Sequence, residues 1–152
     1  MRVRKKKVII LKNQIVNIFM KNGKKQTGEK ILLKSSKMLQ KSSRKKFQNL
    51  VQLAIINTTS AFKINEQVMK KGKRKSKKIT PSFIVKDSLR IMTALKFIKS
   101  TVQKNKSSTN FYKNLANEIL ASFSSKSQSV EQKTKLQTQI LLNKRYLSKF
   151  KW

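Results

Sequence analysis

Residues 47–68, FQNLVQLAIINTTSAFKINEQV, contain the change of apolar spacing that decides the fold. Up to Thr58 the apolar side chains recur at three- and four-residue intervals, which is the spacing along one face of an α-helix. From Phe62 onward they alternate with other side chains, as they do along one side of a β-strand. A second alternating segment follows at residues 79–85. The sequence therefore predicts a helix that leads into a β-hairpin at about residues 62–85.

The segment between the two predicted strands, residues 70–78, has the sequence KKGKRKSKK, with seven cations in nine residues. A run of like charges with no apolar side chain predicts a long and poorly structured hairpin tip. Pro81, in the second strand, has no backbone N–H to donate, which suits an edge strand. Both strands of an isolated ribbon are edges, so we expect a two-stranded hairpin that protrudes from the rest of the protein.

Helical spacing on both sides of the hairpin predicts about six helices, three before it and three after it. The expected caps of five of these helices are Asn13, Thr27, Asp87 or Ser88, Ser108 or Thr109, and Ser129. Glu29 is expected in the first turn of the second helix. The fourth helix has apolar side chains on two sides, which is typical of the centre of a bundle. We predict a mainly α, single-domain bundle at residues 13–152, with the hairpin between its third and fourth helices, preceded by a basic N-terminal arm at residues 1–12.

The net charge of the chain is its most unusual property. The 152 residues include 38 Lys and Arg but only 5 Asp and Glu, which gives a formal net charge of +33. A surface that carries one sign of charge repels itself and destabilises the compact state. We therefore expect the protein to function in a complex with a polyanion, and the phosphates of a nucleic acid supply the required charge.

The composition also excludes most kinds of catalytic site. The sequence contains no Cys and no His, so it offers no disulfide, thiolate nucleophile, histidine base or ordinary zinc site. The five acidic residues are scattered singly, at spacings that do not suit acid–base catalysis or the binding of a hard cation. We expect neither enzymatic activity nor a cofactor or metal ion, and we expect no homo-oligomer.

Several features bear on the cellular location. No apolar run approaches the ~20 residues of a membrane span, and neither a secretory signal nor a typical organelle presequence is expected at the basic N-terminus. Only six of the 38 cations are arginine, and Ile, Asn and Phe are abundant. This bias indicates an AT-rich genome, as many organelles have, and a chain made inside an organelle needs no presequence. We predict a mitochondrial location, with a plastid as the alternative.

Four basic segments, at residues 2–7, 24–25, 70–78 and 144–145, are the main functional signal of the sequence. A charge run is usually only a solvated surface, but this chain has too few acids to pair with its cations. Lys24 and Lys25 follow Gly23 in a turn just before a helix, where a phosphate would meet the positive end of the helix dipole. Helices with a protruding basic hairpin suit a structured RNA that has grooves and junctions.

Three aromatic residues lie within the basic C-terminus, at Tyr146, Phe150 and Trp152. Two interpretations of these side chains remain open. They could stack on RNA bases, or Trp152 could fold back onto the helical bundle.

Three motifs resemble those of one protein family, the seventh protein of the small ribosomal subunit in its bacterial and organellar form. Residues 15–29, IVNIFMKNGKKQTGE, resemble the first helix of that family and its Gly-Lys-Lys turn. Residues 115–119, LANEI, are similar to its Leu-Ala-Asn-Glu-Leu helix, and residues 150–152, FKW, to its aromatic–basic–Trp ending. The resemblance covers nearly the whole chain and has the same order of helices and hairpin.

The resemblance implies a protein of the small-subunit head that binds the 3′ major domain of the ribosomal RNA early and nucleates its assembly. The partners it implies are this RNA, neighbouring head proteins, the exit-site tRNA and the messenger RNA near its exit path. The implied ribosomal RNA-binding residues are Arg2, Arg4, Lys5, Lys6, Lys7, Lys24, Lys25, Arg90, Lys144 and Arg145. The residues implied to lie near tRNA and messenger are Lys70, Lys71, Lys73, Arg74, Lys75, Lys77 and Lys78.

Two other classes of function compete with this interpretation. The first is an architectural nucleic-acid-binding protein of an organelle that acts outside the ribosome, for example in DNA packaging. The second is a cationic membrane-active protein. We disfavour the second, because the apolar stripes look wide enough to pack against one another and the polar faces are not separated as an interfacial helix requires.

Overall fold

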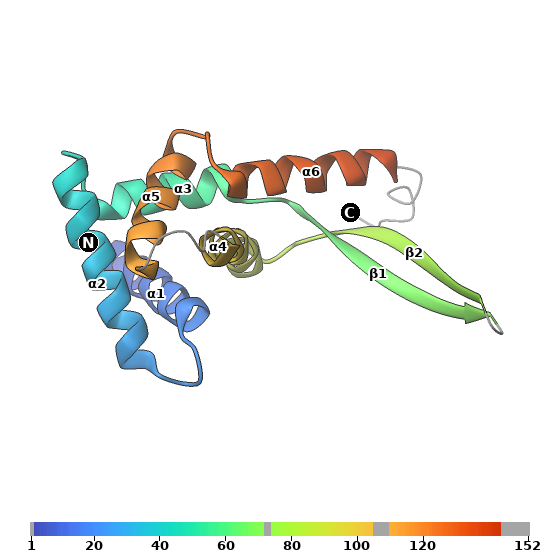
Figure 1. The fold of residues 1–152 in the computed structure, drawn as a ribbon, viewed down its shortest axis with the longest axis horizontal. Helices are drawn as coiled ribbons and strands as arrows, with labels where there is room; N and C mark the ends of the chain where they lie inside the picture. The colour runs from blue at the N-terminus through green and yellow to red at the C-terminus, as the bar shows by residue number, and fades with distance from the viewer. Residues whose placement is uncertain (1, 72–73, 105–109, 144–152) are drawn as a thin grey trace.

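The computed structural model describes residues 2–71, 74–104 and 110–143 and contains six helices and one β-hairpin (Figure 1). The helices are α1 (Arg2–Phe19), α2 (Lys25–Ser42), α3 (Phe47–Thr58), α4 (Asp87–Lys104), α5 (Phe111–Phe123) and α6 (Gln128–Leu142). The strands are β1 (Phe62–Lys71) and β2 (Arg74–Phe83), which pair antiparallel between α3 and α4. The predicted fold class and the predicted position of the hairpin are confirmed. Within the described ranges, none of the helices combines the length and hydropathy that a membrane span needs.

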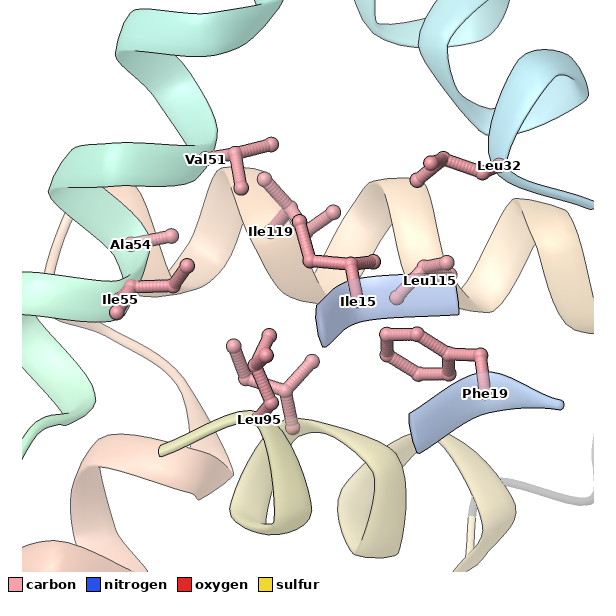
Figure 2. Close-up of a pocket in the computed structure, with 10 residues that line it drawn as sticks. Ile15, Phe19, Leu32, Val51, Ala54, Ile55, Leu95, Leu115 and Ile119 are labelled. Atoms are coloured by element: carbon pink, nitrogen blue, oxygen red, sulfur yellow. The ribbon is translucent and has the colours of Figure 1, made fainter. Parts of the chain in front are cut away.

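The core is formed by apolar side chains that converge from the first five helices (Figure 2). The side chains that surround its centre are Ile15, Phe19, Leu32, Val51, Ala54, Ile55, Leu95, Ile98, Leu115 and Ile119. All of these side chains are buried. The small space between them is lined only by apolar groups, so it is an imperfection of core packing and lacks the polar groups that orient a ligand.

Helix α4 lies at the centre of the bundle, as its two apolar sides predicted. It packs against α1, α3, α5 and α6. On one side Leu95, Ile98 and Val102 are buried in the core. On another side Phe97 lies beside the base of the hairpin, in a pocket with Phe62. The same helix therefore supports both the core and the hairpin.

The beginnings of the first two helices differ from the prediction. Helix α1 begins at Arg2 and continues past Asn13, so residues 2–12 of the predicted arm are helical. The apolar stripe of this helix extends back to the half-buried Leu11, which gives the helix a packing face before Asn13. Helix α2 begins at Lys25 with Lys24 at its N-cap, so Thr27 does not cap it and Glu29 lies beyond its first turn.

The beginning of the last helix also differs from the prediction. Ser127, not Ser129, caps α6, and its side chain accepts a hydrogen bond from the backbone N–H of Val130. Ser129 is fully buried and donates from its hydroxyl to Oε1 of Glu118 on α5, at 2.5 Å. A capping box was expected at Ser129, but a buried carboxylate from a preceding helix takes its hydroxyl as a partner.

The beginnings of the remaining two capped helices are closer to the prediction. Helix α4 begins at Asp87, which lies in its first turn. Helix α5 begins at Phe111 with Asn110 at its N-cap, while the expected caps Ser108 and Thr109 lie outside the described residues.

Candidate nucleic-acid interface

Helix α6 packs against β1, and beyond it the β-hairpin extends away from the helices along the long axis of the molecule (Figure 1). Its strands are longer than predicted: β1 continues to Lys71 and β2 begins at Arg74. The prediction of a poorly structured tip across residues 70–78 is therefore wrong for all the described residues of that segment. Backbone pairing of the two strands continues into the lysine run as far as Lys71 and Arg74, and within this run only residues 72–73 are not described.

The strand register brings cationic residues to opposite positions. Lys70 pairs with Lys75, and Lys71 pairs with Arg74. Residues of like charge at directly opposite positions destabilise a ribbon. A polyanion beside this part of the hairpin would neutralise that charge, which makes it a candidate phosphate-binding surface.

The base of the hairpin is fixed to the helical bundle by one arginine of α4. The Nε of Arg90 donates to the carbonyl oxygen of Ile84, at 2.8 Å, and its guanidinium carbon lies 5.0 Å from the ring centre of Phe83. Phe83 in turn meets Phe62 edge to face, with ring centres 5.6 Å apart. The backbone N–H of Ile84 donates to Ala61 at 2.9 Å. These contacts fix the direction in which the cationic strands leave the bundle.

Arg90 was predicted to bind ribosomal RNA, and the structure places it within the fold. Its side chain is 29% exposed and forms a salt bridge of 3.6 Å with Asp87. The guanidinium is therefore shared between the hairpin base and the start of α4. Contact with RNA through its exposed part stays a prediction.

The Gly-Lys-Lys turn connects α1 with α2 as predicted. Asn22 and Gly23 adopt the left-handed conformation, with φ of 53° and 71°. Lys24 and Lys25 are exposed, and no side chain caps the first turn of α2. The turn therefore presents two cations at a helix N-terminus, where the helix dipole also favours an anion.

The remaining predicted RNA-binding residues lie at the two ends of the chain. The five N-terminal cations, at residues 2–7, occupy the first turns of α1, and their side chains are outside what the structure describes. Lys144, Arg145, Tyr146, Phe150 and Trp152 follow the end of α6 and lie outside the described residues. The choice between base stacking and packing for the three aromatics therefore stays open.

The chain was compared with models of known protein families. The model of the family described as ribosomal protein S7p/S5e matches residues 2–143. The chain belongs to this family. A search of curated proteins gave no match.

Membership of the S7p/S5e family establishes the general function. The chain is a small-subunit ribosomal protein that binds ribosomal RNA and contacts ribosomal neighbours, and the family is structural, not enzymatic. The competing interpretation, an architectural nucleic-acid binder outside the ribosome, is not favoured by this match. Among the described residues, no three His, Cys, Asp or Glu side chains gather where they could hold a metal ion.

Some cations of this S7p/S5e protein serve the fold, and sequence reasoning did not identify them. The ammonium of Lys99 on α4 donates to the carbonyl of Ile18 near the end of α1. The ammonium of Lys133 on α6 donates to the carbonyl of Asn57 near the end of α3, at 2.8 Å. Both lysines satisfy carbonyls that a helix leaves without a partner in its last turn. Their partners are far away in the sequence, so no local pattern could have found them.

The prediction also missed a row of lysines on α2. Lys30, Lys34, Lys37 and Lys41 are all exposed. Their spacing of four, three and four residues places them on one face of the helix. This spacing is visible in the sequence, and a search for helical periodicity among cations, and not only among apolar residues, would have found it.

Proposed function

We propose that this S7p/S5e protein acts in the head of the small subunit of a mitochondrial ribosome. In this role it binds the 3′ major domain of the ribosomal RNA early in assembly and nucleates the folding of the head. Its hairpin lies near the exit-site tRNA and the path by which the messenger leaves. The family match supports the ribosomal part of this proposal.

The observation that supports a place near tRNA and messenger is the geometry of the hairpin. Its cationic strands project beyond the helices, while its base is fixed to α4 through Arg90 and Phe83 (Figure 1). A rigid base with a charged outer part can reach an RNA that the bundle itself does not touch. The bundle can bind the ribosomal RNA through other cations, among which Lys24 and Lys25 are exposed at the start of α2.

The mitochondrial location is proposed from coding bias. Lysine predominates strongly over arginine, and only one proline occurs in 152 residues. A genome rich in A and T encodes lysine, isoleucine and asparagine readily and arginine and proline rarely. A plastid genome shares this bias and is the alternative location.

Head assembly and the binding of exit-site tRNA are expected to depend on different cations, so two variants of the protein can distinguish them. Substituting glutamine at Lys70, Lys71, Lys75 and Lys77 removes four cations of the hairpin. We expect small subunits reconstituted with this variant to assemble normally but to bind exit-site tRNA roughly tenfold more weakly, because phosphate contacts are lost there. Sedimentation and filter binding of labelled tRNA measure the two properties.

The matched control carries glutamine at Lys96, Lys104, Lys113 and Lys135, which are exposed on α4, α5 and α6. This control has the same net charge and should leave tRNA binding unchanged. If the hairpin variant instead fails to assemble while the control assembles, the hairpin serves head assembly and its proposed place beside tRNA is wrong.

A further inference from the structure

Helix α2 carries its charges and its apolar groups on opposite faces. Gly28, Leu32, Ser35 and Leu39 are buried against the rest of the bundle. The row of Lys30, Lys34, Lys37 and Lys41, which we call the α2 lysine row, is exposed on the other face. With a rise of 1.5 Å per residue, the row extends over about 16 Å of helix.

The α2 lysine row has no acidic partner among the side chains that the structure describes. In that part of the chain Asp87 and Arg90 alone form a salt bridge, and both lie in α4. The single acid of α2, Glu29, is half-buried. Lysines three and four residues apart on a helix repel one another. The free protein therefore maintains a repulsive row that an anion would relieve.

The N-terminus of α2 adds further positive charge to this helix. Lys24 and Lys25 are exposed there, the first turn contains no acid, and no side chain caps it. Cations are unfavourable at this end of a helix because the dipole is already positive there. Helix α2 thus carries cations both at its start and along its outer face, and none of them has a salt-bridge partner among the described residues.

One lysine of the row is held by an aromatic side chain. The ammonium of Lys34 lies 5.7 Å from the ring centre of the half-buried Tyr112, at the start of α5. This cation–π contact restricts the lysine near the middle of the row. A partly ordered row loses less conformational entropy when it binds.

We infer that the α2 lysine row binds the phosphodiester backbone of ribosomal RNA at a site separate from the hairpin. The inference rests on the proposed function in the small-subunit head. Helix α2 and the outer ends of strands β1 and β2 lie at opposite ends of the molecule, so one short phosphate segment does not reach both (Figure 1). Because ammonium groups act as point charges and lack the fork of a guanidinium, the row recognises backbone charge and not base identity.

The test compares binding to a folded transcript of the small-subunit RNA over a range of salt concentrations. The row variant carries glutamine at Lys30, Lys34, Lys37 and Lys41, and glutamine keeps the helix propensity of lysine. The control carries glutamine at Lys96, Lys104, Lys113 and Lys135. Losing four phosphate contacts should reduce the log–log salt slope by roughly 3 for the row variant and by less than about 1 for the control.

The outcomes separate this inference from the proposed function. Equal slopes for the two variants would mean that only net charge matters, and would overturn the inference. If the wild-type protein does not prefer this RNA over duplex DNA, the proposed function is wrong, and the inference that rests on it is overturned too. Circular dichroism checks that both variants are folded.

A second measurement uses the unmodified protein and does not depend on variants. We expect the RNA to protect the four lysines of the α2 row from acetylation about fivefold or more, relative to the four control lysines. Protection that appears only when other subunit proteins are added would assign the row to an acidic protein partner and would overturn the inference.

Discussion

The helical bundle and the β-hairpin of this chain, which has a net charge of +33, differ in what stabilises them against the repulsion of like charges. In the bundle, fully buried side chains such as Leu39, Leu50 and Leu115 hold the helices together while exposed lysines point outward. In the hairpin, two strands pair through Lys70 with Lys75 and Lys71 with Arg74, and Val68 is 54% exposed. A two-stranded ribbon is marginally stable in water wherever no other element packs against it.

The difference indicates where the polyanion matters most. Burial of apolar surface stabilises the bundle with or without RNA. The outer part of the hairpin pairs cationic residues that repel one another, so its stability depends more strongly on the partner. The hairpin base, where Arg90 and Phe83 meet, separates the part of the protein that burial stabilises from the part whose stability depends on the polyanion.

The largest expected effect comes from a core substitution. Leu50, on α3, is 1% exposed, and Leu50→Ala should lower the free energy of unfolding by about 2–5 kcal/mol because it leaves a cavity. Val68→Ala in the hairpin should change it by less than about 0.5 kcal/mol. Urea denaturation measures both. A loss at Val68 as large as that at Leu50 would mean that the hairpin is packed like the core.

An intermediate effect is expected at the boundary between the two regions. Arg90→Lys removes the Nε donor to Ile84, a hydrogen bond from a charged group worth about 1.5 kcal/mol. The amide of Ile84, which donates to Ala61, should then exchange its hydrogen roughly tenfold faster. Amides in the middle of α3 should not change.

The control for this variant is Arg44→Lys, the same change at an exposed arginine between α2 and α3. It should leave the exchange at Ile84 as it is in the wild type. Faster exchange throughout the bundle in Arg90→Lys would show that Arg90 supports the whole fold and not only the hairpin base.

The smallest effect is expected from salt acting on the free protein. Raising the salt concentration from about 0.05 M to 0.5 M screens the like charges at the outer end of the hairpin. The amides there should gain about 0.4 kcal/mol of protection, or roughly twofold slower exchange. Lys75→Glu places an acid opposite Lys70 and should remove this salt dependence. An equal gain in α3 would mean that salt stabilises the protein as a whole.

Much of the fold could be predicted because local patterns determine it. The alternation of Phe62, Ile64 and Val68 indicated a strand, and the strand is there. The two apolar sides of the fourth helix indicated a central position, which α4 occupies. The Gly-Lys-Lys turn joins two helices at the predicted place, with Gly23 in the left-handed conformation.

Helix beginnings and hairpin length were predicted less well, because they depend on contacts from elsewhere in the chain. Asn13 looks like a cap, but Leu11 gives α1 a packing face before it. Ser129 looks like a cap, but Glu118 takes its hydroxyl. The lysine run looked unstructured, but antiparallel pairing continues into it as far as Lys71 and Arg74.

The candidate interface, too, was predictable from the sequence only in part. The sequence identified the cationic segments, because charge is a property of the residues themselves, and it contained the spacing of the α2 lysine row. It could not show that Arg90 fixes the hairpin base or that Lys99 and Lys133 bind helix-end carbonyls. Those roles depend on where distant segments meet.

By itself, the sequence determined the class of fold, the order of the elements and the need for a polyanion, since apolar period and net charge are local or additive properties. Only the tertiary structure decided which cations are available to RNA. A lysine that lies beside a buried helix end binds a carbonyl, whereas a lysine on the outer face of α2 finds no acid within reach among the described residues. The electrostatic partner of a side chain depends on the packing around it, and packing is set by the whole chain.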